Sequence, residues 1–186
     1  FEGALDRLGR MLRFGTTTVE SKSGYGISWT HERKMLDVNR RLAAAQPMDL
    51  ISTFLGAHDF PPEIDRENKK QRDRYIEELT EEMIPRVADE GLAEFCDVYC
   101  DTGYYSAAES ERILRCGMDY GLAPRIHTDA YENIGGGRLA AELPAVSADH
   151  LNYLSMDEMK ALAENGVAGV VLPALDFAVA HPNPFN

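Results

Sequence analysis

Three histidines lie at or just past the carboxyl ends of predicted strands, and an imidazole there can bind a metal ion or transfer a proton at neutral pH. His127 lies in a short strand over residues 125–129, His150 ends a strand over 145–150, and His58 follows a strand over 50–55. In α/β folds the carboxyl ends of parallel strands carry the chemistry. Imidazoles at successive strand ends can therefore face one pocket. The alternative, that each histidine merely caps its strand, stays open at this point.

Two other strand ends carry polar side chains of a useful type. Tyr25 lies in the turn Lys22–Gly26, where two glycines allow positive φ angles and present the phenol at the end of the first strand. Asp101 follows the strand at 95–99. Each also has a structural interpretation, as a loop tyrosine packed on a neighbour and as a cap for a turn.

A run of three glycines at 135–137 follows the strand of His127. A tight turn into a helix near residue 138 explains these glycines. The alternative, a phosphate cradled at a helix N-terminus, is the less favoured interpretation.

Hydrophobic periodicity and turn residues indicate helices and strands that alternate strictly. Pro85 should kink or split the long helix over 72–90, and Ser106 with Glu109 and Ser155 with Glu158 form capping boxes. The predicted strands are 16–20, 50–55, 95–99, 125–129, 145–150 and 167–172; the predicted helices are 2–14, 30–45, 72–90, 106–117 or 121, 138–143 and 155–165.

Alternating β and α elements predict an α/β fold with a parallel sheet, either doubly wound or closed into a barrel. No GxGxxG motif follows the first strand, so a dinucleotide-binding fold has little support. Polar residues recur at many strand ends, which favours a (β/α)8 barrel, because a barrel gathers all strand ends around one mouth. Six strands are nevertheless two fewer than a complete barrel needs.

The bulk composition narrows the classes of partner. The 186 residues have a formal net charge of −12, which argues against nucleic acid and anionic membranes and fits a small-molecule substrate. No apolar run approaches the ~20 residues of a membrane helix. The three cysteines, an odd number without CxxC spacing, predict reduced thiols in the cytoplasm.

Four segments resemble the imidazolonepropionases, metal-dependent amidohydrolases of histidine degradation. They are Gly15-Thr-Thr-Thr-Val-Glu-Ser-Lys-Ser-Gly-Tyr-Gly26, Thr53-Phe-Leu-Gly-Ala-His58, Ile126-His-Thr-Asp129 with Ile134-Gly-Gly136, and Ser147-Ala-Asp-His-Leu151. They occur in order and span nearly the whole chain. The resemblance implies an incomplete TIM barrel, in which residues 1–186 correspond roughly to strands two to seven and lack the first and eighth strands and the family's β-sandwich.

The resemblance also implies a role for each matching residue. His127 matches the metal ligand on the fifth barrel strand, and His150 matches the histidine that orients or deprotonates the metal-bound water. Tyr25 and His58 match residues that bind the imidazolone ring. The implied reaction is hydrolysis of the cyclic amide of 4-imidazolone-5-propanoate to N-formimidoyl-L-glutamate, with zinc or iron as the cofactor.

The chain departs from the family pattern in two ways. Ala130 stands where the family has Glu or Gln, so either Asp129 covers part of the substrate-binding role or substrate handling differs. The family's other metal ligands would lie outside residues 1–186, and a hydrolytic zinc site takes about three protein ligands. We therefore expect this chain alone not to retain metal or turn over, and its open strand edges to favour self-association into a homo-oligomer.

Two alternatives to this function stay open. A related amidohydrolase with a different cyclic amide substrate is motivated by Ala130. A non-catalytic barrel fragment that self-associates is motivated by the absent ligands.

Overall fold

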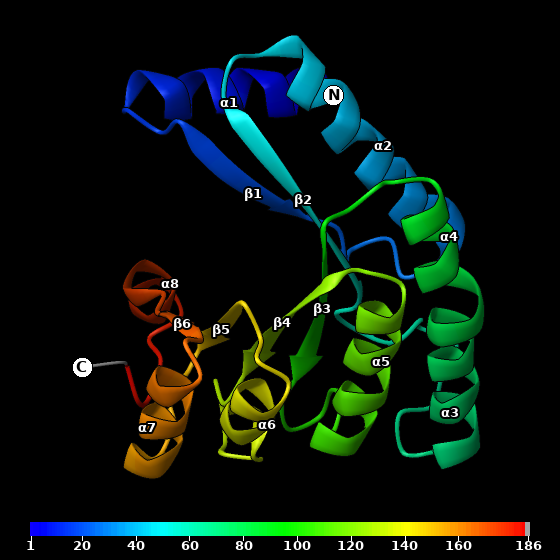
Figure 1. Cartoon of the computed structure of the whole chain (residues 1–186), viewed down its shortest axis with the longest axis vertical. Coiled ribbons are helices and arrows are strands. Elements are labelled where there is room, and N and C mark those ends of the chain that lie inside the picture. Colours follow the sequence, from blue (N-terminus) through cyan, green and yellow to red (C-terminus); the bar gives the residue numbers. More distant parts are fainter. Residues whose placement is uncertain (185–186) are drawn as a thin grey trace.

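A computed structural model describes residues 1–184, and it contains one sheet of six parallel strands in the order β1-β2-β3-β4-β5-β6 (Figure 1). The strands are β1 Thr18–Lys22, β2 Asp49–Ala57, β3 Phe95–Cys100, β4 Ala123–Thr128, β5 Ser147–His150 and β6 Ala168–Val170. Each strand pairs with the next along the chain, so the predicted α/β class and the parallel sheet are confirmed. The last two residues of the predicted 1–186 domain lie outside the described part.

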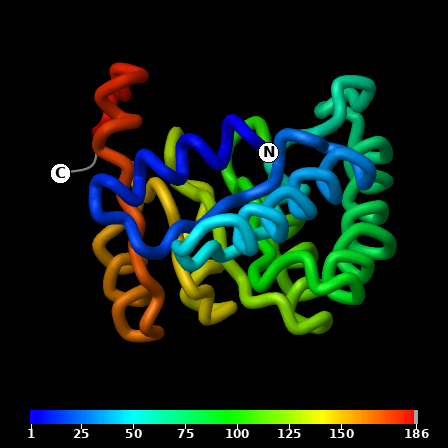
Figure 2. The backbone as a smooth tube through the Cα atoms, turned by 90° about the horizontal axis from the view of Figure 1, so that it is seen from above, coloured from blue at the N-terminus to red at the C-terminus, as the bar shows by residue number. Residues whose placement is uncertain are grey.

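The helices from α2 to α7 connect successive strands and lie on the outer side of the sheet, whereas α1 precedes β1 and α8 follows β6 (Figure 2). Every crossover between parallel strands needs such a connection. The helices are α1 Glu2–Arg13, α2 Trp29–Ala45, α3 Lys69–Glu78, the π-helix η1 Leu79–Met83, α4 Ile84–Asp89, α5 Ala107–Asp119, α6 Gly136–Glu142, α7 Met156–Glu164 and α8 Pro173–Ala178.

The sheet curls from β1 to β6 without closing (Figure 1). Among the described residues, β1 pairs only with β2 and β6 pairs only with β5. This arrangement confirms the predicted incomplete barrel, in which the concave side of the sheet corresponds to the barrel interior. None of the helices in the described residues is both long and apolar enough to cross a membrane.

Alternation along the strands separates the two sides of the sheet. On β3, Cys96, Val98 and Cys100 are fully buried in the main apolar core between sheet and helices. Phe95, Asp97 and Tyr99 alternate with them and therefore face the concave side. The sheet thus places a carboxylate and a phenol inside the curve.

Several predicted boundaries shift in the structure. β1 begins at Thr18 and includes Lys22, which the sequence placed in the following turn. Pro173 lies in the first turn of α8, where its missing N–H is not needed, so it starts a helix as well as ending a strand.

Pro85 splits the long helix by a specific device. Pro has no N–H, and its ring clashes with the carbonyl one turn earlier. The helix widens into the π-helix η1 just before this proline. The N–H of Ile84, the residue after η1, donates to the Leu79 carbonyl, and α4 continues with Pro85 in its first turn. Both predicted capping boxes are formed, by Ser106 with Glu109 and by Ser155 with Glu158.

Candidate functional site

The structure brings together four of the five predicted site residues around a fifth side chain, Tyr99. The ring of Tyr25 lies 4.8 Å from that of His58, and the ring of His127 lies 5.4 Å from that of His150. Tyr99 lies between these two pairs, with ring centroids 5.7 Å from His58 and 6.2 Å from both His127 and His150. The sequence predicted the four residues separately, and the ends of β1, β2, β4 and β5 place them at one mouth.

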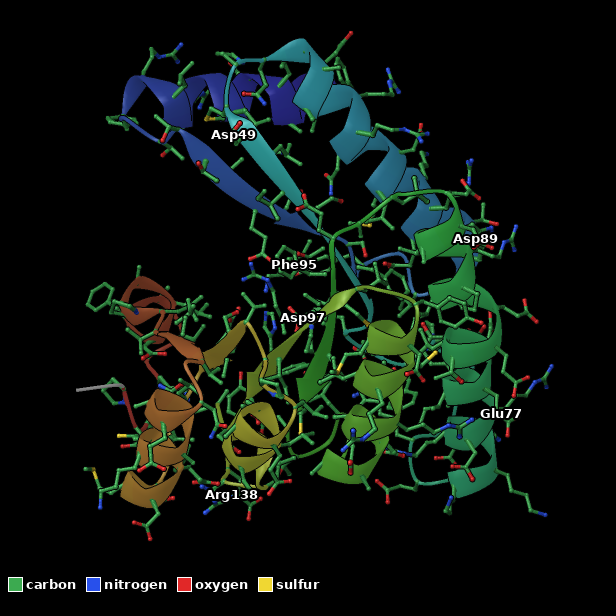
Figure 3. All side chains as sticks on the ribbon, in the orientation of Figure 1. Asp49, Glu77, Asp89, Phe95, Asp97 and Arg138 are labelled. Atoms are coloured by element: carbon green, nitrogen blue, oxygen red, sulfur yellow. The ribbon has the colours of Figure 1, made fainter. Side chains whose placement is uncertain are left out.

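His127 is held from behind by a carboxylate. It lies opposite Tyr99 in the β3–β4 register, with Asp97 one inward position earlier on β3, and Figure 3 labels Asp97 on this strand. The Nδ1 atom of His127 lies 3.1 Å from the Asp97 carboxylate, and Nε2 lies 3.9 Å from Oδ2 of Asp149. The ring therefore has a fixed orientation, with Nε2 facing the concave side near Asp149.

Lys22 completes this cluster from the end of β1. Its Nζ lies 2.7 Å from Oδ2 of Asp97 and 3.0 Å from Oδ2 of Asp149. Asp97 is fully buried, and Lys22 keeps only 20% of its side chain exposed. A buried carboxylate needs such partners, because an isolated ion costs several kcal/mol to bury.

Charge pairing outweighs burial in this cluster. Burial alone would raise the pKa of Asp97, but His127 and Lys22 hold that pKa below its usual range. Burial alone would lower the pKa of His127, but the adjacent Asp97 carboxylate raises it above the ordinary value of 6.5. The pairing thus favours the protonated form of His127 beside the Asp97 carboxylate.

This ion pair predicts a pH dependence of stability. Because the pKa of His127 is higher in the folded than in the unfolded protein, its ion pair stabilises the fold. This stabilisation is complete at pH values below the unfolded pKa, about 6.5, and is lost as the pH rises through the folded pKa. We expect wild type to exceed His127→Gln in unfolding free energy at pH 6, and the difference to shrink at pH 9. Urea unfolding at both pH values measures it, and a difference that grows with pH would contradict the ion pair.

His150 reaches the mouth through an unusual backbone conformation. Asp149 already faces the concave side, so a regular strand would turn the next side chain outward. His150 instead has φ of 77°, and Leu151 has φ of 65°, a region that non-glycine residues rarely adopt. Burial, with the nearby charge of His127 adding to it, lowers the pKa of His150 to about 4. The ring is therefore neutral around pH 7 and can accept a proton.

Asp129, the fifth predicted residue, lies in a turn rather than at the mouth. Its side chain is fully buried, and its two oxygens accept hydrogen bonds from the backbone N–H groups of Ile134 and Gly137. The structure therefore does not bring Asp129 to the other four. Its contacts fix the glycine turn that follows β4.

The glycine run is explained by packing. A Cβ atom on Gly136 would lie 1.6 Å from Oγ1 of Thr128, and Gly135 has φ of 88°. The amide of Gly137 already donates to Asp129. These contacts favour the tight turn over a phosphate cradle.

Ala130 is buried under the segment that follows α8. His181 Nε2 donates to the Ala130 carbonyl at 2.7 Å, and the His181 ring stacks on Tyr131. Asp101 accepts hydrogen bonds from the Ala130 and Tyr131 amides, which favours its interpretation as a turn cap. The chain at Ala130 is thus held from both sides through its backbone.

Tyr25 is presented by a loop built on a buried carboxylate. Glu32 in α2 is fully buried and accepts hydrogen bonds from the amides of Gly24, Gly26 and Ile27. Tyr25 itself is 78% exposed. The loop is therefore ordered while its phenol stays available at the mouth.

The ligand atoms of three side chains lie close enough together to fit a divalent ion. Asp97, His127 and Asp149 offer ligand atoms that all lie within 4.8 Å of one another. Lys22 already neutralises both carboxylates, and Asp97 binds Nδ1 of His127. A carboxylate behind one imidazole nitrogen is the usual support for a metal bound at the other. His127 Nε2, beside Asp149, is therefore the atom that fits a metal ion.

Sequence reasoning missed Lys22, Asp97, Tyr99, Asp149 and Glu32. A period-two reading of β3 would have found Asp97 and Tyr99, because they alternate with Cys96, Val98 and Cys100 in an otherwise apolar run. Glu32 carried no comparable signal, since an acidic residue in the first turn of a helix is ordinary.

The sequence is similar to curated proteins over almost all of its length. It is 49% identical over 177 residues to an imidazolonepropionase of Geobacillus thermodenitrificans, covering 95% of this chain and 41% of that protein. It is 44% identical over 183 residues to an imidazolonepropionase of Streptococcus gordonii, covering 96% and 42%. No family model matches the chain.

Solved structures share the fold at low sequence identity. The ADAL structure from Arabidopsis with IMP has a TM-score of 0.65 and 10% identity, covering 97% of this chain and 55% of that one. Guanine deaminase from C. acetobutylicum has a TM-score of 0.62 and 13% identity, covering 97% and 46%. Over about 95% of its own length, then, this chain is a homologue of the imidazolonepropionases, and it spans about two fifths of theirs.

Proposed function

We propose that this chain carries the catalytic middle of a hydrolase that opens the cyclic amide of 4-imidazolone-5-propanoate to N-formimidoyl-L-glutamate. One observation carries the proposal: Tyr25, His58, His127 and His150 meet at one mouth in a chain homologous to imidazolonepropionases. Water adds to the amide carbonyl carbon, and the ring C–N bond breaks. The products of that step are a carboxylate and a nitrogen that takes up a proton.

We assign the proton transfers to His150. Burial keeps the His150 ring in its neutral form near pH 7. A neutral imidazole is the form that can accept the proton of the attacking water and then donate it to the departing nitrogen. His127 Nε2 is the proposed ligand of a zinc or iron ion, with Asp97 fixing its orientation. When bound, such an ion polarises the amide carbonyl and lowers the pKa of water.

Tyr25 and His58 are the proposed contacts of the substrate ring. Burial, with the charge of His127 adding to it, lowers the pKa of His58, so a neutral imidazole faces the planar ring. Asp129 supports the site through its turn, as its two backbone hydrogen bonds suggest. The three cysteines are free thiols, which fits the proposed cytoplasmic location.

This chain by itself is proposed to hold metal weakly and to lack turnover. His127 supplies one imidazole, while hydrolytic zinc sites take about three protein ligands. The open strand edges β1 and β6, with Phe14 92% and Phe177 89% exposed, support self-association into a homo-oligomer. Light scattering measures this state, and a monomer would contradict self-association. Absence of metal and of turnover even when the further metal ligands are supplied by another chain or segment would favour the non-catalytic alternative.

Elemental analysis of the purified protein, with an assay of imidazolone propanoate hydrolysis, tests the function. Near-stoichiometric zinc or iron with turnover would support the hydrolase and would show that the missing ligands come from another chain or segment. Ala130 motivates the alternative of a different cyclic amide substrate. Measuring turnover of a panel of other cyclic amides distinguishes this alternative from hydrolysis of the imidazolone. Turnover of another amide and not of the imidazolone would overturn the substrate assignment.

Replacing His150 should remove turnover while leaving metal in place. In the metal-loaded hydrolase we expect His150→Asn to lower kcat by about 10²–10⁴-fold, the usual contribution of a general acid–base group. Asparagine tolerates the positive φ of this position, so the backbone keeps its shape. Steady-state kinetics and metal analysis on the same sample measure both quantities, and loss of metal would instead make His150 a ligand.

A further inference from the structure

We propose that Tyr99 is a positioning residue of the site, an aromatic support that fixes the imidazoles of His58 and His150 in one arrangement. The inference rests on the proposed function, because it assigns a residue to that same site. Tyr99 is not among the site residues predicted from the sequence. It is nevertheless the side chain that links the two proposed functions of the mouth, substrate binding by His58 and proton transfer by His150.

The register of the sheet puts Tyr99 at the centre. It lies on β3 opposite His127 on β4, and β2 runs along its other side into His58. It is 8% exposed, so its ring is held by its neighbours. From this place it contacts His127 in β4, His150 at the end of β5 and His58 just past β2.

The angles and distances between the ring of Tyr99 and the three imidazoles are those of aromatic contacts. The plane of Tyr99 lies 20° from that of His58 and 28° from that of His150, and meets the plane of His127 at 73°. Centroid separations of 5.7 to 6.2 Å lie within the range of favourable aromatic contacts. Asp97 already orients His127, and His58 has a hydrogen bond to the Gly24 backbone. No carboxylate in the described residues bonds to His58 or His150, and Tyr99 is the ring that contacts both.

Tyr104 packs beside Tyr99, whose place in the sheet is set by the pairing of β3 with β4. The two rings lie 4.1 Å apart at 38°, and the Tyr105 amide donates to the Tyr99 carbonyl. Among the described residues, Tyr104 has no ring contact with a histidine. It therefore offers a matched control, an aromatic neighbour of Tyr99 that does not touch the imidazoles.

The first test follows the imidazole nitrogens by NMR at pH 8, where His58 and His150 are neutral. Their ¹⁵N relaxation reports how firmly each ring is held, which contact with Tyr99 changes. We expect wild type, Tyr99→Phe and Tyr104→Leu to show rigid rings. In Tyr99→Leu we expect lower ring order at His58 and His150, with His31, an exposed residue of α2, unchanged. Unchanged ring order at both histidines in Tyr99→Leu would overturn the inference. Tyr99→Met gives the same comparison should the leucine variant not fold.

The second test uses the metal-loaded hydrolase. We expect Tyr99→Leu to raise KM and lower kcat together, by about 100-fold in kcat/KM, because small misplacements of reacting groups have effects of this size. Tyr99→Phe should restore both constants. The NMR result does not depend on turnover. Loss of ring order in Tyr99→Leu, with no hydrolysis even by the hydrolase that holds its metal and all its ligands, would refute the proposed function alone. Hydrolysis with KM and kcat unaffected in Tyr99→Leu would refute this inference alone.

Discussion

Replacing His127 with alanine in the metal-loaded hydrolase should abolish metal binding, whereas replacing His58 with alanine should leave the metal bound and weaken substrate binding. The two imidazoles differ in what lies behind them. His127 has Asp97 at 3.1 Å from Nδ1, which frees Nε2 for an ion, while His58 faces the rings of Tyr25 and Tyr99. Elemental analysis after gel filtration, together with KM, measures both effects. Metal retained in His127→Ala would overturn the ligand assignment.

The Asp97→Asn variant tests the support behind the metal ligand without removing the ligand itself. The amide keeps the shape of the carboxylate but loses its charge, so His127 stays in place with a weaker hold on its tautomer. Substitutions behind a metal ligand typically lower metal affinity by about 10- to 100-fold. Competition with a chelator of known affinity measures this loss, and an affinity equal to wild type would mean that Asp97 acts only through Lys22.

The fold followed from local signals that tertiary contacts did not override. Strands were predicted from apolar runs and helices from capping boxes such as Ser106 with Glu109, which satisfies backbone groups locally. The π-helix before Pro85 could not be predicted, because proline signals a break without specifying how the carbonyls one turn earlier are rearranged. The early start of α3 at Lys69 was missed because its exposed, charged face carries little hydrophobic period.

The site was predicted only where residues follow strands. That rule singled out His58, His127 and His150, which the structure brings together because strand ends meet at one edge of a parallel sheet. Their roles stay predictions. It missed Asp97 and Lys22, which lie within β3 and β1 and act through pairing across several strands. The substrate-binding role of Asp129 came from the resemblance and stays a prediction, although its carboxylate accepts hydrogen bonds from two backbone amides.

The ammonium of Lys22 has the largest expected effect on stability. It lies within 3.0 Å of two carboxylates, one of which, Asp97, is fully buried. Both carboxylates raise the pKa of Lys22 against the opposing effect of its burial, so the side chain stays charged. Removing one partner of a buried ion pair leaves an uncompensated charge, which typically costs about 3–5 kcal/mol.

We therefore expect Lys22→Met to lower the unfolding free energy by about 3 kcal/mol, toward the lower end of that range because His127 still pairs with Asp97. Lys69→Met is the matched control: Lys69 pairs with Asp73 one turn along α3 but is 84% exposed, and such pairs contribute about 0.3–0.5 kcal/mol. Urea unfolding of the two variants gives the comparison. Equal losses of unfolding free energy in the two variants would mean that water reaches Asp97. In that case the effects of Lys22→Met and Asp97→Asn on the unfolding free energy should simply add in the double variant. A recovery of stability in that double variant, relative to Lys22→Met alone, would locate the cost in the unpaired carboxylate.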